Sequence, residues 1–279
     1  STLAEAYSVL AARPPGLRVL AGGTDLMVQI NARVDLDNLG QILDIWGLPP
    51  LRAVELRGDK LIIGALTTYM DLIQSPLVRA RFPALAEVSR EVGAWAIQNR
   101  GTLGGNVCNA SPAGDTLPLL LAADAQFILG GPRGERAVAA SDFFVGYRKT
   151  ALAADELLLR VEVPTQSRKP GEKVLYRKVG TRRAQSISRI LLAVGANVVG
   201  KSLHNVRLAA GCVAPVPLRC RAAESALEGK QLDPEVLSSA RNALEADIHP
   251  IDDIRGTAEY RRTASANVME QLLSALVQS

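Results

Sequence analysis

The chain has 279 residues, of which 48% are hydrophobic and 22% are charged. This balance can bury a sizeable core and excludes a disordered protein, and at roughly 150 residues per domain the length predicts about two domains. The three cysteines and two histidines stand at no metal-ligand spacing, which excludes an iron–sulfur protein, a zinc ribbon and a disulfide-framework domain. We therefore expect no metal site in this chain, whose chemistry is either borrowed from a cofactor or partner or absent.

We also expect neither a secretory signal nor a membrane span. Residues 1–16 lack a basic segment followed by an apolar one. The longest nearly uncharged stretch, residues 190–200, is far shorter than the roughly 20 residues that a span needs. The sequence therefore predicts a cytoplasmic protein.

The positive charge of the chain is localised. The net charge is +4, but residues 151–200 alone hold nine lysines and arginines against four acidic residues. A solvated basic face and a site for an anionic cofactor or partner both explain this excess. Nucleic-acid binding is disfavoured, because the segment contains a single aromatic residue, Tyr176.

The first half of the chain predicts short helices and strands in mixed order. Thr2 and Glu5 form a capping box for a helix that ends near Arg13. The pattern then predicts a strand at Arg18–Leu20, a helix from Thr24 or Asp25 to about Arg33, a buried strand at Gln41–Ile45, a hairpin of Val54–Leu56 with Lys60–Ile63, and helices at Thr67–Gln74 and Pro83–Val92.

The second half predicts a turn-rich loop, further hairpins and a separate helical end. The expected elements are a loop over residues 100–114, a helix at Asp115–Ala123 capped by Asp115, a hairpin of Gln126–Leu129 with Arg136–Ala139, a strand at Leu157–Val163, a linker at Thr165–Lys173, strands at Val174–Val179, Leu191–Val199 and Asn205–Val213, and helices at Arg219–Glu228, Pro234–Ala246 and Thr257–Val277. Strands and helices do not alternate strictly, so the fold class is α+β rather than doubly wound α/β.

Two glycine-rich segments are candidates for ligand binding. The first, residues 20–26, joins a strand to a helix, where glycines let backbone N–H groups approach an anion and the helix dipole favours negative charge. A turn with a purely structural role explains this segment as well. The second, residues 101–115, is rich in Gly, Asn, Ser and Thr, and a long loop of this composition usually carries function. Together the two segments are able to hold opposite parts of one dinucleotide.

The order and spacing of these motifs resemble one protein family. The chain has Ala-Gly-Gly-Thr-Asp-Leu at 21–26 and Thr-Leu-Gly-Gly-Asn at 102–106, the latter extended by Ala-Ser-Pro-x-x-Asp at 110–115. This pair resembles the FAD-binding medium subunit of the molybdenum hydroxylases, the family of xanthine dehydrogenase and carbon monoxide dehydrogenase. The resemblance continues through residues 176–183, 211–215 and 258–262 and covers nearly the whole chain.

The resemblance implies a fold and a cofactor site. The implied fold is a two-lobed FAD-binding domain of the vanillyl-alcohol-oxidase (PCMH) type over residues 1–165, with lobes of about 1–55 and 56–165. A smaller α+β domain with a three-stranded antiparallel sheet and helices follows over residues 166–279. The matching FAD-binding positions are Val19, Leu20, Ala21, Gly22, Gly23, Thr24, Asp25, Leu26, Thr102, Gly105, Asn106, Cys108, Asp115, Leu158 and Lys178.

The family also implies roles at these positions. The first segment would wrap the FAD pyrophosphate, and the second would bind the diphosphate and flavin side. Asp115 would bind the adenosine end, Leu158 would make an apolar contact, and Lys178 would counter a negative reduced flavin or phosphate. Cys108 would lie close to the flavin ring, as a small buried thiol or as a redox-active or modified one.

The implied function is electron transfer through noncovalently bound FAD, between [2Fe–2S] centres of a partner and a terminal acceptor. We find no catalytic side-chain constellation and no metal-binding one, so the flavin would supply the chemistry. The implied partners are a small [2Fe–2S] subunit and a large molybdopterin subunit, in a dimer of heterotrimers. Two alternatives stay open, namely a stand-alone FAD-dependent oxidoreductase and a non-catalytic nucleotide-binding scaffold subunit.

Overall fold

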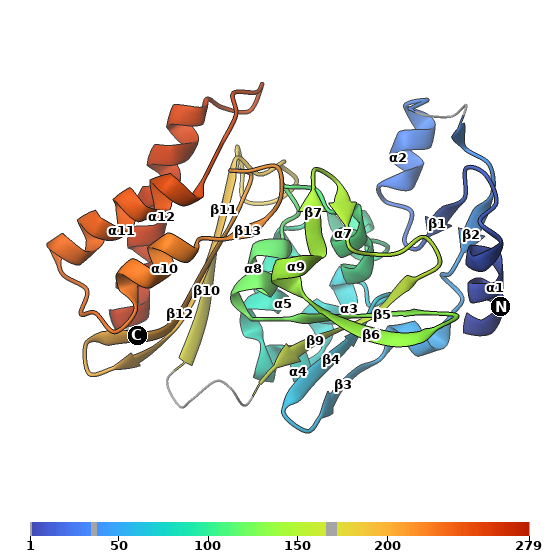
Figure 1. Ribbon diagram of the computed structural model, residues 1–279, viewed down its shortest axis with the longest axis horizontal. Helices are drawn as coiled ribbons and strands as arrows, with labels where there is room; N and C mark the ends of the chain where they lie inside the picture. The colour runs from blue at the N-terminus through green and yellow to red at the C-terminus, as the bar shows by residue number, and fades with distance from the viewer. Residues whose placement is uncertain (1, 35–37, 166–171, 279) are drawn as a thin grey trace.

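The computed structural model of the chain describes residues 2–34, 38–165 and 172–278, so most of the expected linker (166–171) lies outside the described residues. The structure has a small N-terminal part, a central part built on a five-stranded sheet, and a C-terminal part built on a four-stranded sheet (Figure 1). The order of helices and strands is mixed, as the α+β prediction requires.

The N-terminal part consists of α1 (Leu3–Ala12), β1 (Arg18–Leu20), α2 (Leu26–Asn31) and β2 (Ile42–Asp44). The predicted capping box is confirmed, because the Thr2 hydroxyl accepts from the Glu5 N–H and the Glu5 carboxylate accepts from the Thr2 N–H. β1 and β2 pair in parallel. The prediction of a buried strand here was wrong, since Ile42 is 44% exposed and β2 has a single neighbouring strand.

The central sheet has the order β3-β4-β9-β5-β6 and is antiparallel throughout. Its strands are β3 (Val54–Arg57), β4 (Lys60–Gly64), β5 (Gln126–Gly131), β6 (Gly134–Ala139) and β9 (Leu157–Pro164). Four helices accompany it, namely α3 (Tyr69–Gln74), α4 (Pro76–Arg81), α5 (Pro83–Glu91) and α8 (Leu117–Ala122). The four phenylalanines of the chain all lie in this core, so its few aromatic residues are concentrated where the sheet meets the helices.

The C-terminal sheet contains β10 (Glu172–Val179), β11 (Ile190–Val199), β12 (Ser202–Gly211) and the two-residue β13 (Leu218–Arg219), all antiparallel. One face packs on α8 and the other on α10 (Arg221–Leu227) and α12 (Ala258–Gln278), and α11 (Pro234–Asp247) packs against these two helices (Figure 1). Both faces are therefore buried, which explains the continuous apolar run of β11. The three predicted strands are confirmed; β13 is too short to produce a sequence pattern.

Several short elements were not predicted. They are η2 (Pro49–Arg52), α4, α6 (Trp95–Gln98), α7 (Leu103–Asn109), α9 (Ala140–Phe143), β7 (Phe144–Gly146) and β8 (Lys149–Thr150). The expected loop over 100–114 is therefore wrong at its centre, where α7 forms despite two glycines. The cause is local and tertiary: the Thr102 hydroxyl accepts from the Gly105 N–H, and the absent side chain of Gly104 lets α7 approach Ala65.

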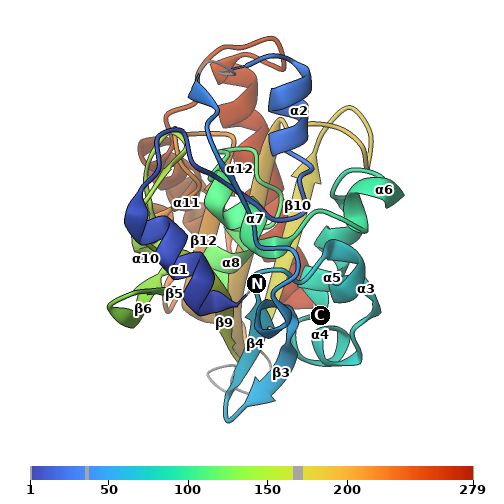
Figure 2. The ribbon, with the colours of Figure 1, turned by 90° about the vertical axis from the view of Figure 1, so that its right-hand side faces the viewer.

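Figure 2 shows how the N-terminal part sits on the rest of the molecule. α1 lies in front of the central part, α2 lies near the top of the view, and α3 to α6 lie to one side. The first glycine segment, between β1 and α2, thereby contacts the start of the second glycine segment, at Arg100 and Gly101. Segments about 80 residues apart in sequence thus form one structural unit.

Candidate functional site

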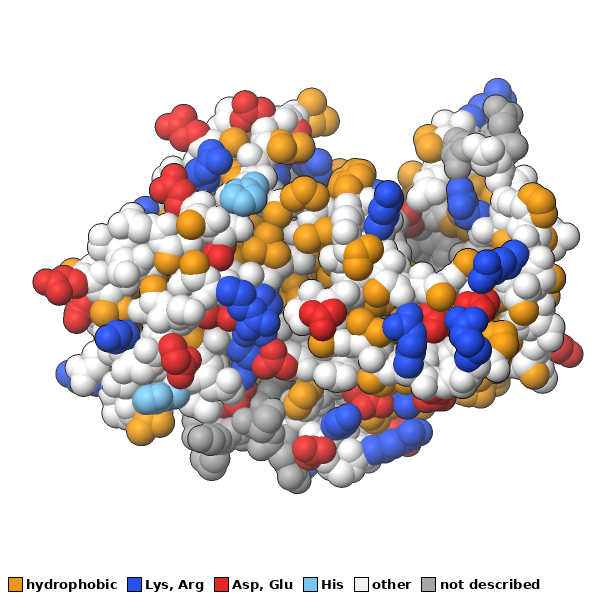
Figure 3. Space-filling model, viewed as in Figure 1, with side chains coloured by type: hydrophobic (Ala, Val, Ile, Leu, Met, Phe, Trp, Pro, Cys, Tyr) orange, Lys and Arg blue, Asp and Glu red, His pale blue; other side chains and the backbone are white. Residues whose placement is uncertain are grey.

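A cavity of about 700 Å³ lies between the two glycine segments. The surface is hollowed there, between α2 and the centre of the molecule (Figure 3). Thirteen of the fifteen predicted site residues line it: Val19, Leu20, Ala21, Gly22, Gly23, Thr24, Asp25, Leu26, Thr102, Gly105, Asn106, Cys108 and Leu158. The structure therefore brings the two segments together around one space, of a size typical for small-molecule ligands.

The first segment needs glycine for two different reasons. A Cβ at Gly22 would lie 1.7 Å from the carbonyl oxygen of Arg100, so only glycine allows the two segments to touch. Gly23 has a φ of +77°, a conformation that residues with side chains rarely adopt. The glycines thus fix the wall of the cavity.

The second segment enters the cavity wall through α7. Thr102 caps the helix, with 3.0 Å between its Oγ1 and the Gly105 nitrogen. The Asn106 side chain is held by the Thr116 hydroxyl, which donates to Asn106 Oδ1 over 2.7 Å. These bonds leave the glycine backbone facing the cavity and fix the amide group of Asn106.

The cavity also offers donors for an anion. Among the described residues, the backbone N–H groups of Gly22, Gly23 and Thr24 have no hydrogen-bond acceptor in the protein. Backbone donors of this kind are satisfied by water or by a ligand, and successive N–H groups in a turn suit a phosphate. Apolar side chains such as Leu66, Ile97 and Leu152 line other parts of the cavity. Donors beside apolar walls fit a dinucleotide with a flat ring system.

A stacked arginine–tryptophan–arginine cluster braces the two segments. The guanidinium carbons of Arg52 and Arg100 lie 4.0 Å and 3.8 Å from the centre of the Trp46 ring. Trp46 follows β2, the partner strand of β1, and Arg100 directly precedes the second glycine segment. Cation–π contacts stabilise by about 0.5–1 kcal/mol at exposed sites and more when desolvated. The cluster thus connects the supports of both segments.

The two remaining predicted residues, Asp115 and Lys178, lie outside the cavity lining and contact each other. The Lys178 ammonium lies 2.8 Å from Asp115 Oδ2 and also donates to the Glu91 carbonyl oxygen. Ser188 Oγ donates to Asp115 Oδ1 over 2.7 Å. Asp115 is not the cap of α8 as expected, because Thr116 occupies that position. The pair instead joins the central part to β10, and the cofactor roles implied for it stay predictions.

Three titratable side chains at the cavity have shifted pKa values that keep each of them in one protonation state near neutral pH. Burial raises the pKa of the Tyr69 phenol, and the nearby Asp115 carboxylate raises it further. Cys108 is reached from the cavity, but the surrounding walls desolvate its thiol and raise its pKa to about 12. Hydrogen bonds from the Arg136 guanidinium hold the pKa of Glu156 below its ordinary value. Tyr69 and Cys108 are thus protonated and Glu156 ionised, a set suited to binding rather than to proton transfer.

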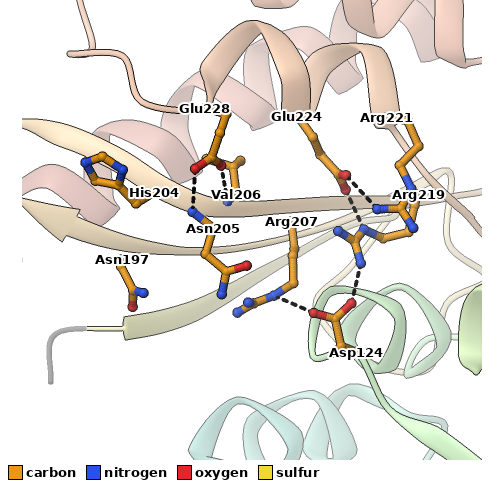
Figure 4. Close-up of a pocket in the computed structure, with 10 residues that line it drawn as sticks. All are labelled: Asp124, Asn197, His204, Asn205, Val206, Arg207, Arg219, Arg221, Glu224 and Glu228. Atoms are coloured by element: carbon orange, nitrogen blue, oxygen red, sulfur yellow. Dashed lines mark hydrogen bonds and ion pairs between the residues drawn. The ribbon is translucent and has the colours of Figure 1, made fainter. Parts of the chain in front are cut away.

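A second hollow, of about 590 Å³, lies between β11, β12, α10 and the end of α8 (Figure 4). Asp124 lies between two arginines there, with its oxygens 3.4 Å from Arg207 Nε and 2.5 Å from Arg219 Nη1. Arg207 also pairs with Glu172, and Arg219 with Glu224. The arginines are thus neutralised by carboxylates of the chain, and this network ties the central part to the C-terminal sheet.

The described ranges contain neither a metal-ligand cluster nor a membrane-spanning helix. No group of three or more metal-ligating side chains comes together in residues 2–34, 38–165 and 172–278. Within the same ranges, every helix is too short or too polar to pass through a lipid bilayer.

Comparison with known proteins gives two family matches. Residues 1–166 match the FAD binding domain in molybdopterin dehydrogenase, and residues 175–276 match the CO dehydrogenase flavoprotein C-terminal domain. The carbon monoxide dehydrogenase medium chain of Hydrogenophaga pseudoflava is 33% identical over 98% of this chain and 94% of its own length. The xanthine dehydrogenase FAD-binding subunit of Escherichia coli O157:H7 is 32% identical over 99% of this chain and 94% of its own.

Solved structures agree with these matches. A carbon monoxide dehydrogenase structure from Hydrogenophaga pseudoflava superposes with a TM-score of 0.91 and 32% identity, covering 97% of this chain and 92% of the other. Quinoline 2-oxidoreductase from Pseudomonas putida 86 superposes with a TM-score of 0.89 and 26% identity, covering 99% and 94%. The fold described above is therefore shared along nearly the whole chain.

Sequence reasoning missed several residues of the cavity. Tyr69, Ile97 and Leu152 are apolar or aromatic residues whose patterns predict only core packing. Arg148, on the turn between β7 and β8, lies 39 residues after Asn109 of the second segment and belongs to no recognised motif. The local excess of basic residues begins beyond position 150, so Arg148 lies just before it.

Proposed function

The chain belongs to the family of FAD-binding medium subunits of molybdenum hydroxylases, and from this premise we propose how its residues serve that role. It is the flavoprotein subunit of a multi-subunit oxidoreductase, and its cofactor is FAD. FAD supplies the redox chemistry that lets this subunit pass electrons between [2Fe–2S] centres of a partner and a terminal acceptor. A stand-alone oxidoreductase and a scaffold subunit are not favoured, because the similarity to flavoprotein subunits spans nearly the whole chain.

The observation that carries the site proposal is the contact of Gly22 with the backbone of Arg100 at the wall of a cavity of about 700 Å³. This contact places the free N–H groups of the first segment beside the capped start of α7. We propose that Gly22, Gly23 and Thr24 donate to the pyrophosphate of noncovalently bound FAD. The ten further predicted residues of the lining would contact the cofactor along the cavity: Val19, Leu20, Ala21, Asp25, Leu26, Thr102, Gly105, Asn106, Cys108 and Leu158.

The Asp115–Lys178 pair serves the proposal differently. It lies at the junction of the central part with β10, and its buried charges fix the start of α8 relative to the C-terminal sheet. The implied contacts of Asp115 with the adenosine end and of Lys178 with the flavin or phosphate are kept as proposals. They require the cofactor to reach this pair beyond the cavity lining.

The partners follow from the family. Medium chains of carbon monoxide dehydrogenase type work with a small and a large subunit, and this chain has the same fold along its length. The metal cofactors, molybdopterin and [2Fe–2S], belong to those partners. We further propose a dimer of heterotrimers, a division into domains 1–165 (lobes about 1–55 and 56–165) and 166–279, and a cytoplasmic location. The mass of the purified complex, limited proteolysis and cell fractionation test these three statements.

The cofactor proposal is tested on the purified chain. We expect a yellow protein that releases one equivalent of FAD into the supernatant when it is denatured with acid. We expect Gly23→Asp and Gly105→Asp to lose the flavin with the fold intact, whereas Gly47→Asp, at a position where a Cβ meets nothing within 4 Å, keeps it. Full FAD content in both cavity variants would refute the two-segment site.

A further inference from the structure

The turn between β7 and β8 places one cationic side chain at the cavity. Tyr147, Arg148 and Lys149 are all exposed, but of the three only Arg148 lines the cavity. Arg148 itself has a φ of +51°, in the left-handed region that a side chain enters at a cost. The backbone is thus turned so that this one side chain faces inward.

The guanidinium of Arg148 lies between the two glycine segments. Its Nη1 donates to Asn109 Oδ1 over 2.7 Å, at the end of α7, and lies 3.9 Å from Asp25 Oδ2, at the start of α2. Asp25 is also held by Gln29, whose Nε2 donates to the same Oδ2 over 2.6 Å. Arg148 therefore touches the residue that directly follows the backbone donors of Gly22, Gly23 and Thr24.

Most of the donor capacity of this arginine is unused. A guanidinium carries five N–H donors, and here only Nη1 has an acceptor among the described residues. The side chain is 42% exposed, so it is free to turn. The Asp25 contact is long, and its carboxylate already has Gln29 as a donor. Replacement of Asp25 by a stronger acceptor for the Arg148 guanidinium would therefore require little free energy.

The charged side chains of the cavity lining are balanced in number, and one of the carboxylates has an arginine partner outside the lining. The lining contains two arginines, Arg18 and Arg148, and two carboxylates, Asp25 and Glu156. Glu156 is neutralised from behind by the two-pronged contact with Arg136. An arginine fork that faces backbone N–H donors is a common arrangement for phosphate groups, because it binds two oxygens at once.

We propose that Arg148 is a further cofactor-binding residue. Its guanidinium gives up the contacts with Asp25 and Asn109, and its N–H groups then bind the diphosphate of FAD. The inference rests on the proposed function, because it takes the occupant of the cavity to be FAD. It adds a residue outside both glycine motifs, and it makes the β7–β8 turn part of the cofactor site. Arg148 binds the ligand and takes no part in the transfer of electrons.

The test compares ligands with and without the diphosphate on the full-length chain freed of flavin. Binding of FAD and riboflavin is measured by flavin fluorescence, and binding of ADP by competition with FAD. We expect Arg148→Gln to weaken FAD and ADP binding at least tenfold, in line with a charged hydrogen bond, and to leave riboflavin binding within twofold. Lys149→Gln removes the same charge from the same turn and should change none of the three.

The salt dependence of FAD binding gives a second readout. A direct ion contact makes affinity fall with ionic strength, so the fall should be shallower in Arg148→Gln than in wild type and Lys149→Gln. Arg148→Lys keeps the charge without the fork, and should keep the salt dependence while losing part of the affinity. If Arg148→Gln fails to fold, Arg148→Lys takes its place in the test. Its affinity for FAD and ADP should then fall, while its affinity for riboflavin stays unchanged.

The outcomes separate the two proposals. Failure of the wild-type chain to bind FAD would refute the proposed function itself. If wild type binds FAD but Arg148→Gln matches Lys149→Gln, or weakens riboflavin as much as FAD and ADP, Arg148 does not bind the diphosphate. An unchanged salt dependence in Arg148→Gln would overturn the proposal as well.

Discussion

Gly22 and Arg100 touch through their backbones, so that a Cβ at position 22 would lie 1.7 Å from the Arg100 carbonyl oxygen. Backbone atoms cannot yield as a side chain can. We therefore expect Gly22→Ala to separate the two segments and to weaken FAD binding at least tenfold. Gly47→Ala is the matched control, since a Cβ there meets no atom within 4 Å. Equal FAD affinities of the two variants, measured by fluorescence titration, would show that the contact does not shape the site.

The Asp115–Lys178 ion pair should stabilise the chain before any cofactor binds. The Lys178 side chain is 1% exposed and the Asp115 side chain 12%, so Asp115→Asn leaves a buried ammonium without its counter-charge. We expect a loss of about 3–5 kcal/mol in the free energy of unfolding, measured by denaturant titration without FAD.

The double variant Asp115→Asn/Lys178→Met should lose less than the sum of the two single variants, because the second change removes the unpaired charge. Glu55→Gln breaks an exposed pair with Arg57 and should cost at most about 1 kcal/mol. Strict additivity at Asp115 and Lys178 would mean that the two charges do not interact.

Removal of the Trp46 ring should loosen the cavity wall. Trp46→Leu loses both arginine stacks, and we expect FAD affinity to fall about five- to thirtyfold, as two cation–π contacts of about 0.5–1 kcal/mol each would give. Trp46→Phe keeps an aromatic face and should recover part of the loss. Trp95→Leu is the control, because that side chain is 72% exposed. A Trp46→Phe variant no better than Trp46→Leu would exclude the stacking explanation.

The Arg136–Glu156 contact should make stability depend on pH in one direction. Because the guanidinium lowers the pKa of Glu156 in the folded state, its stabilisation is complete above the ordinary glutamate pKa of about 4.3. This stabilisation is lost as the pH falls through the lowered pKa that Glu156 has in the folded state. The melting temperature of Arg136→Gln should therefore lie below that of wild type at neutral pH, and the two should converge in acid. A difference that stays constant from neutral to acidic pH would contradict this assignment.

The Cys108 thiol should react slowly although the cavity exposes it. A pKa of about 12 makes the thiolate fraction near neutral pH about a thousandfold smaller than for an ordinary cysteine. We expect iodoacetamide to alkylate Cys108 far more slowly in the native chain than in the unfolded one, as read by mass spectrometry of the peptide. Saturating FAD should slow the native reaction further. Alkylation at the unfolded rate would place this thiol outside the desolvated wall.

The sequence by itself determined the elements whose signals are local. The capping box of Thr2 and Glu5, the three long strands of the C-terminal sheet and the two glycine motifs each lie within a few consecutive residues. Such patterns report backbone preference and periodicity, which neighbouring residues alone can set. The family resemblance came from the same motifs, and the matches along both parts of the chain confirm it.

Only the tertiary structure decided which distant residues meet. The helix at Leu103–Asn109 has poor propensity, and it forms because Gly104 lets it pack against Ala65. Asp115 was expected to cap a helix, and contact with Lys178, 63 residues away, gives it an ion-pair partner instead. Arg148 reaches the cavity because the β7–β8 turn folds back onto α2 and α7. Such contacts depend on the packing of separate segments, which no local pattern encodes, and they give the cavity its shape and charge.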